Sequence, residues 1–256
     1  MLKRFFTAIS YISLTLSVLF ILRDVALAAH LTIGYIELPP YYFTDAQHKP
    51  AGFLIDLTQK IMDRAGHECC YKSMPSNRIL HTIQKESSFV SIGWFKTNER
   101  LEYAKFSQPI YENKPIVVLI RRDNYDRFQN LDTLQEILEQ HKFKTGLIAG
   151  HSMGEYVDNL LGKYPQAAHK LSGTTIQLVR MLHSNHIDFC LLAPKEIATI
   201  IEQSNLDKND FYSMPMADIS TGNKRYLMFS QDIPDKTIKK INKAIAKIKT
   251  KVLATK

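Results

Sequence analysis

The strongest constraint on the fold is the regular alternation of short β-rich runs with amphipathic helical segments. Residues 31–36 are β-rich, and residues 53–64 carry apolar side chains at the spacing of one helical face before Gly66 ends the helix. Further strands are predicted at 68–74, 89–93, 115–121, 144–149, 187–193 and 225–230, and further helices from 75, at 132–140, 152–161, 175–184 and 194–203, and from 234. Repeated β-α units predict an α/β protein with mainly parallel sheets flanked by helices.

The alternation restarts at Lys144, which divides the elements into two cycles. Two cycles in a chain of 256 residues predict two lobes of about 100 residues each. In such folds ligands bind at the carboxyl ends of strands, and commonly between lobes. A ligand cleft is therefore expected where the two lobes meet.

The first 28 residues have the pattern of a secretory signal. Lys3 and Arg4 precede an uncharged, mostly apolar run at residues 5–22, and Ala26-Leu27-Ala28 supplies the small residues that signal peptidase requires. We expect cleavage near Ala28 and a soluble periplasmic protein. An uncleaved anchor is the alternative, because a run of this length is near the lower limit of a membrane span.

The formal net charge of +8 would by itself indicate a nucleic acid or an anionic membrane as partner. Its distribution indicates otherwise: residues 1–28 carry three bases and one acid, and residues 236–256 carry eight lysines and no acid. The remaining residues hold 33 − 3 − 8 = 22 bases and 25 − 1 = 24 acids. We therefore expect no nucleic-acid partner, and we expect the last helix to pack by one face and solvate its lysines.

The sequence carries no pattern typical of catalysis or metal binding. The nine histidines are scattered, and no Ser-His-Asp spacing or nucleotide-binding loop is present. Cys69, Cys70 and Cys190 are interpreted as small buried hydrophobic residues, with a bond from Cys190 to either of the others left open. The expectation is a protein that is not an enzyme and needs no cofactor or metal.

Five blocks in order along the chain resemble the bacterial extracellular solute-binding proteins of family 3. The blocks are Gly34-Tyr-Ile-Glu-Leu-Pro-Pro-Tyr41 with Asp45, Gly52-Phe53 and Asp56-Leu57; Gly93-Trp-Phe-Lys-Thr-Asn-Glu-Arg100 with Phe106-Ser-Gln-Pro-Ile-Tyr111; Gly146-Leu-Ile-Ala-Gly150; His186-Ile-Asp188; and Ile241-Asn-Lys-Ala-Ile245. The resemblance implies the two-lobe periplasmic-binding fold of type II, with residues 29–113 and 220–256 in lobe 1 and 114–219 in lobe 2. It also implies a monomer that delivers a small solute to an inner-membrane ABC permease or reports it to a sensor.

Arg100 is the first candidate for ligand contact, because the Arg of this motif grips a carboxylate in amino-acid-binding relatives. A planar guanidinium can make two parallel charge-assisted hydrogen bonds to a carboxylate. The alternative is a surface Arg paired with Glu99 or Glu102.

Further candidates follow from the same motifs. Tyr41 and Trp94 are predicted to wall the cleft, with core packing as the alternative for each. Arg78 is a second candidate cation, with a solvated helix residue as the alternative. His151 and Ser152 lie at a predicted helix N-terminus, which favours anions, and Ser152 is also predicted to form a capping box with Glu155.

Two departures from the resemblance concern polar contacts. Ala193 stands where amino-acid-binding relatives often place an Asp for the ligand's ammonium, and Phe95 stands where they have a small hydroxyl residue. A buried ammonium without a carboxylate is costly. A standard α-amino acid is therefore disfavoured, unless Glu37 or Asp218 supplies the carboxylate.

The sequence predicts a periplasmic protein that binds a small carboxylate-bearing solute between two lobes. Two alternatives stay open. One is an enzyme on the same scaffold, resembling dehydratases of cyclic carboxylates. The other is an exported interaction protein that binds no solute, which only the Lys-rich last helix supports.

Overall fold

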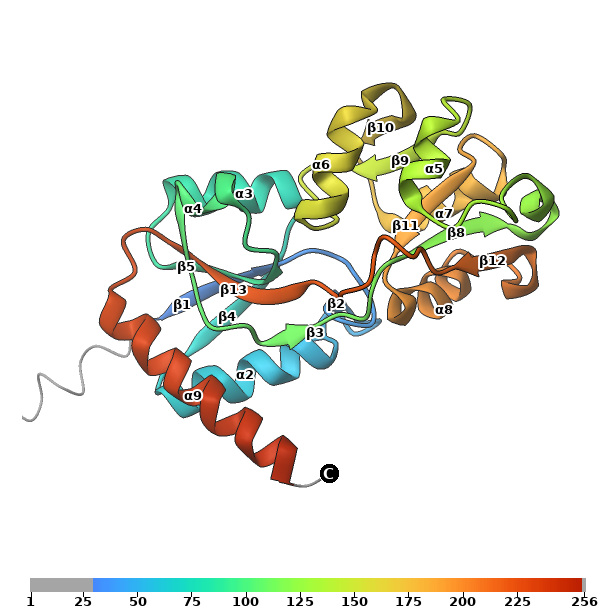
Figure 1. Ribbon diagram of the computed structural model, residues 1–256. Coiled ribbons are helices and arrows are strands. Elements are labelled where there is room, and N and C mark those ends of the chain that lie inside the picture. Colours follow the sequence, from blue (N-terminus) through green and yellow to red (C-terminus); the bar gives the residue numbers. More distant parts are fainter. Residues whose placement is uncertain (1–29, 255–256) are drawn as a thin grey trace, which may run out of the picture.

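The chain forms two α/β halves that lie side by side, each around its own sheet (Figure 1). The computed structural model describes residues 30–254. The first sheet has the order β4 (Cys69–Ser73), β1 (Leu31–Tyr35), β5 (Phe89–Trp94), β13 (Lys224–Ser230) and β6 (Ala104–Phe106), with β7 (Tyr111–Glu112) paired to β13. The second has the order β10 (Ala168–Leu171), β9 (Thr145–Ile148), β11 (Phe189–Leu192), β8 (Val117–Arg121) and β12 (Phe211–Met214). We call the sheets with their helices the first and second half.

Helices cover both sheets, as the alternating pattern predicts. The first half carries α2 (Phe53–Ala65), α3 (Ser76–Lys85), the single turn α4 (Asn98–Leu101) and α9 (Asp235–Ala254), together with a short hairpin of β2 (Phe43–Thr44) and β3 (Pro50–Ala51). The second half carries α5 (Leu134–Glu139), α6 (Glu155–Lys163), α7 (Thr175–His183) and α8 (Pro194–Gln203). Short 3-10 turns lie at Arg122–Arg127, Pro165–Ala167 and Lys208–Asp210. The architecture is the expected α/β arrangement with sheets flanked by helices.

The sheets are mixed in strand direction. β1 runs parallel to β4 and β5, and β9 runs parallel to β10 and β11, as βαβ connections require. By contrast β13 runs antiparallel to β5, and β8 runs antiparallel to β11 and β12. Both β8 and β13 directly follow a passage of the chain from one half to the other, so no crossover helix sets their direction.

The chain passes between the halves twice, at residues 113–116 and 215–223. The two passages lie side by side, since the Asn113 amide donates to the Asn223 carbonyl at 2.9 Å and β7 pairs with the start of β13. A side chain at Gly222 would overlap the Asn113 carbonyl oxygen. The lobe boundaries that the sequence predicts fall in these passages and remain a proposal.

Local sequence signals explain where several helices begin and end. Gly66 ends α2 in the left-handed conformation at φ 75°, which glycine adopts without strain. Thr133 with Glu136 and Thr174 with Gln177 form complete capping boxes at the starts of α5 and α7. These side chains replace the hydrogen-bond partners that the first turn of a helix lacks.

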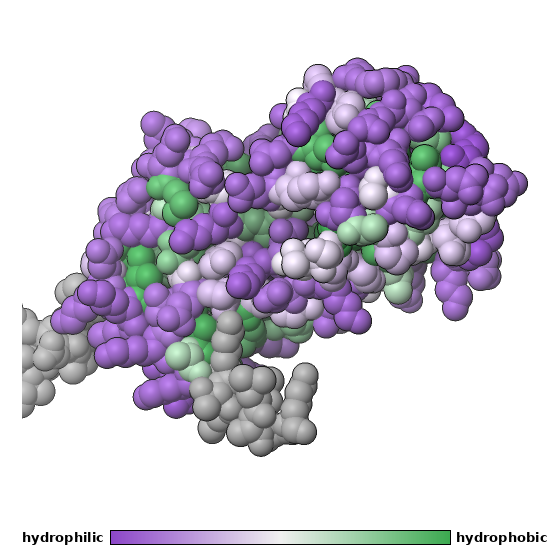
Figure 2. All heavy atoms as spheres, viewed as in Figure 1, coloured by the Kyte–Doolittle hydropathy of each residue, from purple (hydrophilic) through white to green (hydrophobic). Residues whose placement is uncertain are grey.

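Buried apolar side chains form a core in each half, and the largest cluster extends across both. On the face shown in Figure 2 the surface is mostly hydrophilic, with apolar residues visible in small areas. Within residues 30–254, no helix combines the length and apolar character that a bilayer crossing needs. The predicted signal segment lies outside the described residues. The three cysteines are free, with Cys190 buried and Cys69 and Cys70 half-buried.

A cleft between the two halves

Two adjoining cavities lie between the halves and share the side chains of Ile36, Ile148, His151 and Thr175. We call the cavity lined by the buried Arg100, Glu196 and Arg225 the inner cavity; its volume is about 80 Å³. We call the cavity lined by the exposed Glu37 and Ser73 the outer cavity; its volume is about 540 Å³. Most of the inner wall is apolar and comes from both halves, including Ile92, Trp94 and Phe95 from the first and Leu191, Leu192 and Ala193 from the second. This is the cleft that the two-lobe prediction requires.

Arg100 lies on the wall of the inner cavity and is 6% exposed. It sits in α4, whose first turn is capped by Thr97, and its guanidinium lies 4.7 Å from the centre of the Trp94 ring. Nη1 donates to the Phe95 carbonyl at 2.9 Å, and Nη2 donates across the cleft to the Gly150 carbonyl at 3.1 Å. The structure thus brings Arg100, Trp94 and Phe95 together in the cleft.

The charge of Arg100 is not balanced by a direct ion pair. Among residues 30–254, no carboxylate oxygen lies within 4.0 Å of its guanidinium. Arg100 therefore forms no ion pair with Glu99 or Glu102, which was the alternative to ligand contact. Burial lowers its pKa from the ordinary value, although Tyr103, Glu99 and Asp158 act in the other direction. A buried cation with neutral acceptors only is the feature of this cleft that most calls for an anion.

A second buried arginine lies in the same cavity, and the sequence patterns did not identify it. Arg225 of β13 forms an ion pair with Glu196 of α8 at 3.2 Å, with side chains 8% and 6% exposed. Because β13 belongs to the first half and α8 to the second, this ion pair joins the halves across the cleft. Burial raises the pKa of the Glu196 carboxyl to about 7, against the opposing effect of Arg225.

The other donors of Arg225 are also used within the protein. Nε donates to the Asn113 Oδ1 atom at 2.9 Å, and Nη1 donates to the Tyr42 hydroxyl at 2.9 Å and the Gly93 carbonyl at 3.0 Å. The guanidinium lies 4.4 Å from the Tyr41 ring centre and 5.1 Å from that of Phe95. Arg225 is therefore fixed by the structure rather than open to a ligand.

His151 lies where the two cavities meet. Burial and, after it, the charges of Arg225 and Arg100 lower the pKa of the imidazole to about 4. The ring is therefore neutral near pH 7, and it can offer one donor and one acceptor to a bound molecule.

Ser152 also lines the inner cavity, but the capping box predicted for it with Glu155 is wrong. The helix α6 begins at Glu155 itself, after Gly154 at φ 101°. Glu155 is therefore the first residue of the helix and not the third, which is the position that a capping box requires. Asp158 takes this role instead: its carboxylate accepts from the Ser152 hydroxyl and from the Met153 amide, the latter at 2.8 Å. An internal carboxylate thus already occupies the start of α6.

The remaining candidates lie at different distances from the cleft. Glu37 lines the outer cavity, where its carboxylate accepts from the Thr44 amide at 2.8 Å, the Thr44 hydroxyl at 2.7 Å and the Ser73 hydroxyl. Tyr41 is fully buried and lines neither cavity, whereas its neighbour Tyr42 lines the inner one. Arg78 is exposed on α3 and lines neither cavity.

Asp218 lies away from the cleft, at the start of α5. Its carboxylate accepts from the Leu134 amide at 2.9 Å and from the Gln135 amide at 3.1 Å. It does not line the inner or the outer cavity. Asp218 therefore caps a helix and is not placed to replace the missing Asp at Ala193.

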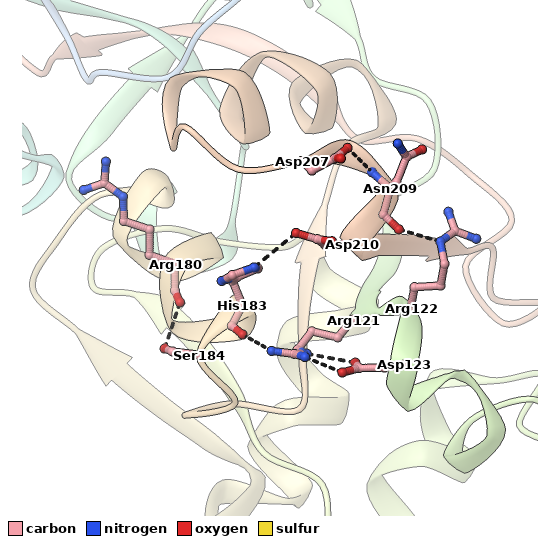
Figure 3. A network of polar contacts seen from close by, with 9 residues as sticks. All are labelled: Arg121, Arg122, Asp123, Arg180, His183, Ser184, Asp207, Asn209 and Asp210. Atoms are coloured by element: carbon pink, nitrogen blue, oxygen red, sulfur yellow. Dashed lines mark hydrogen bonds and ion pairs between the residues drawn. The ribbon is translucent and has the colours of Figure 1, made fainter.

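A further cluster of polar side chains lies in the second half, outside the cleft (Figure 3). Arg121 pairs with Asp123 and donates to the His183 carbonyl, and His183 Nε2 lies 3.2 Å from Asp210. Arg122 donates to the Asn209 and Phe211 carbonyls at 2.6 and 2.9 Å. These contacts join β8, α7 and β12, and none of the nine residues drawn lines the inner or outer cavity.

Among the described residues, no group of three or more His, Cys, Asp or Glu side chains could hold a metal ion. The inner cavity presents one buried cation without an ion pair, a neutral imidazole, and mostly apolar walls.

Comparisons with known proteins agree with this geometry. A family model of the bacterial extracellular solute-binding proteins, family 3, matches residues 31–255. No curated protein matches the chain.

Solved structures share the two-lobe fold at low sequence identity. An arginine-specific periplasmic binding protein of Salmonella typhimurium has 22% identity and a TM-score of 0.67, covering 86% of this chain and 93% of its own. An amino acid ABC transporter substrate-binding protein of Streptococcus pneumoniae, bound to L-arginine, has 16% identity and a TM-score of 0.70, covering 87% and 90%. A histidine kinase sensor domain similar to periplasmic binding proteins has 18% identity and a TM-score of 0.70, covering 88% and 92%.

Proposed function

This chain belongs to the bacterial extracellular solute-binding proteins of family 3, and from that premise we propose that it captures a small carboxylate-bearing, amino-acid-like solute between its two halves. The solute is bound and released unchanged. Neighbours of this fold include both an ABC transporter component and a sensor domain, so the chain delivers its solute to a permease or reports it to a sensor. Both roles are periplasmic and follow export by the N-terminal segment.

The observation that carries this proposal is the unbalanced charge of Arg100. Its guanidinium is buried at the wall of the inner cavity and contacts carbonyl oxygens of both halves. A carboxylate placed there would add the attraction of an opposite charge to a guanidinium that now has neutral acceptors only, and it could accept two parallel hydrogen bonds. Since Arg100 also reaches the Gly150 carbonyl, an anion beside it lies where both halves contribute to binding.

The first test is a panel of carboxylates, amino acids, dicarboxylates and amines, with the melting temperature and calorimetric titration as readouts. We expect at least one carboxylate to bind, and we expect Arg100→Ala to weaken its binding by about thirtyfold or more, since losing one partner of a buried charge pair costs about 2 kcal/mol or more. Arg100→Lys keeps the charge but loses the planar fork, and should bind with intermediate affinity.

Arg78→Ala is the matched control, because Arg78 is exposed and lines neither cavity. It should bind like the wild type. Mass spectrometry of the released solute should recover it unchanged. If amines or uncharged solutes bind and every carboxylate fails, or if Arg100→Ala binds as tightly as the wild type, the proposed function is wrong.

A further inference from the structure

The charged groups of the inner cavity leave it with at least one net positive charge. Among the described residues that line it, the charged side chains are Arg100, Arg225 and Glu196. His151, which also lines the cavity, stays neutral because burial and the two arginines disfavour its imidazolium form. Glu196, whose pKa burial raises to about 7, balances Arg225 when it is ionised, and the charge of Arg100 remains in either form. A monoanion would therefore lower the positive charge of the filled cavity, whereas a zwitterion would leave that charge unchanged.

No carboxylate of the inner cavity is free for a ligand's ammonium. Glu196 is the one carboxylate among the described lining residues, and its Oε1 atom already pairs with the Nη2 atom of Arg225. An ammonium placed beside Glu196 would face this guanidinium, and like charges in a low-dielectric cavity repel strongly. Losing the Arg225 contact to a ligand would also remove one of the contacts that join the halves.

Two aromatic rings that line the inner cavity, those of Trp94 and Phe95, already lie against arginines of the protein. The Arg225 guanidinium lies 4.4 Å from the Tyr41 ring centre and 5.1 Å from that of Phe95. Arg100 lies 4.7 Å from the Trp94 ring centre. At Trp94 and Phe95 the protein's own guanidinium groups thus take cation–π positions that an amine would use.

The rest of the inner wall suits an apolar body. Ile92, Ile116, Leu178, Leu191, Leu192 and Ala193 line it from both halves. Leu192 and Ala193 line the cavity from the second half and offer no side-chain acceptor to an ammonium. Apolar groups in contact with these side chains gain about 25 cal/mol per Å² removed from water.

We infer that the solute is an apolar monocarboxylate without a cationic amine, its carboxylate held by Arg100 and its body by the apolar wall. This inference rests on the proposed function and narrows it. Outside the inner cavity, Glu37 lines the outer cavity, where a distal amine of a longer solute would meet its carboxylate.

The test uses matched pairs that differ only in the amine: 4-methylpentanoate against L-leucine, 3-phenylpropanoate against L-phenylalanine, and hexanoate against 6-aminohexanoate. Calorimetric titration of the full chain should show binding of at least one amine-free acid, about tenfold or more tighter than its partner, because a buried ammonium without a carboxylate is costly. The third pair tests the Glu37 position.

The outcomes separate this inference from the proposed function. If an amino acid binds as tightly as its amine-free partner or more tightly, the inference is overturned and the proposed function stands. If 6-aminohexanoate binds more tightly than hexanoate, Glu37 pairs with the amine and the inference is again overturned. If no carboxylate of either panel binds, both fail.

A charge placed on the second half supplies an independent check. Ala193 lines the inner cavity and is the N-cap residue of α8, where Asp and Asn are both well tolerated. Ala193→Asp should shrink the preference for the amine-free acid at least about threefold relative to Ala193→Asn, since only Asp offers an ammonium a counter-charge. If Ala193→Asp and Ala193→Asn prefer the amine-free acid over the amino acid to the same degree, the missing counter-charge does not explain the preference and the inference is overturned.

Discussion

At the scale of single residues, the cleft holds two buried arginines with opposite roles. Arg225 is balanced by Glu196 and donates to three further acceptors, so it contributes to structure. Arg100 has carbonyl partners and no ion pair within the described residues, so it retains capacity for an anion. The two arginines are equally buried, so burial does not distinguish their roles. The hydrogen-bond and ion-pair partners of each guanidinium do.

His151 supplies a prediction on pH. Its imidazole has an ordinary pKa of 6.5 and a folded-state pKa of about 4, lowered by burial and then by Arg225 and Arg100. Between these values the unfolded chain binds a proton that the folded chain does not, so stability falls as the pH falls from 6.5 to 4. The loss from His151 amounts to about 3 kcal/mol, since one pKa unit corresponds to 1.36 kcal/mol.

The measurement is urea unfolding of wild type and His151→Asn at several pH values. Glu196 acts in the opposite direction, because its folded pKa of about 7 lies above the ordinary 4.5 and favours the folded state as the pH falls. The stability difference between the two proteins removes this common contribution. It should decline from pH 6.5 to pH 4, and a difference that is constant across this range would contradict the prediction.

The sequence led to Arg100, Trp94 and Phe95 because a motif fixes their spacing in one strand and one turn. It did not lead to Glu196 and Arg225, which are 29 residues apart and meet only when the halves come together. The available signal was a charged residue at the head of the apolar run Arg225–Ser230. A charge in a buried strand must find a partner, but its identity depends on tertiary structure.

At the scale of elements, the main strands and helices could be predicted because they are long enough to show a period. The predicted helix at 53–64 and the predicted strand at 187–193 correspond to α2 and β11. The two- and three-residue strands β2, β3, β6 and β7 carry no period, and the polar edge strand β10 has no apolar alternation. Pairing with a neighbouring strand, rather than local sequence, makes these segments extended.

The link between β13 and α8 supplies a prediction at this scale. Arg225→Met should cost about 3–5 kcal/mol of unfolding free energy, because it leaves the Glu196 carboxylate buried without a partner. Adding Glu196→Gln should recover about 1 kcal/mol or more, since it removes a carboxyl that without Arg225 is either buried as an unpaired charge or protonated. Chemical unfolding of the wild type, the two single variants and the double variant gives the double-mutant cycle for this pair.

Arg78→Met is the control for removing a cation, and it should change stability by less than about 0.5 kcal/mol because Arg78 is exposed. A double variant that is no more stable than Arg225→Met alone would show that the lost hydrogen bonds to Tyr42, Gly93 and Asn113 account for the whole cost.

At the scale of the whole molecule, the two passages between the halves share one tight contact. Gly222→Ala places a methyl group against the Asn113 carbonyl oxygen, a backbone atom fixed by the adjacent hydrogen bond from Asn113 to Asn223. We expect a loss of about 2 kcal/mol or more, since overpacking against atoms that cannot move is destabilising.

Gly162→Ala is the matched substitution, because Gly162 lies exposed in α6 with no atom near the added methyl group. It should be neutral or stabilise by up to about 1 kcal/mol, following helix propensity. Thermal unfolding of both variants makes the comparison. Equal shifts in the two would mean that the passages can separate at no cost.

The place of β13 in the first sheet has a consequence for how the protein is made. This strand lies between β5 and β6, although its residues 224–230 are synthesised after the whole of the second half. The N-terminal half therefore waits with an open gap in its sheet while the later half, at residues 117–214, already has every strand it needs. Domains generally fold as units, in the order in which the chain emerges. We therefore expect the order to be reversed here, with the half that carries Arg100 completed last.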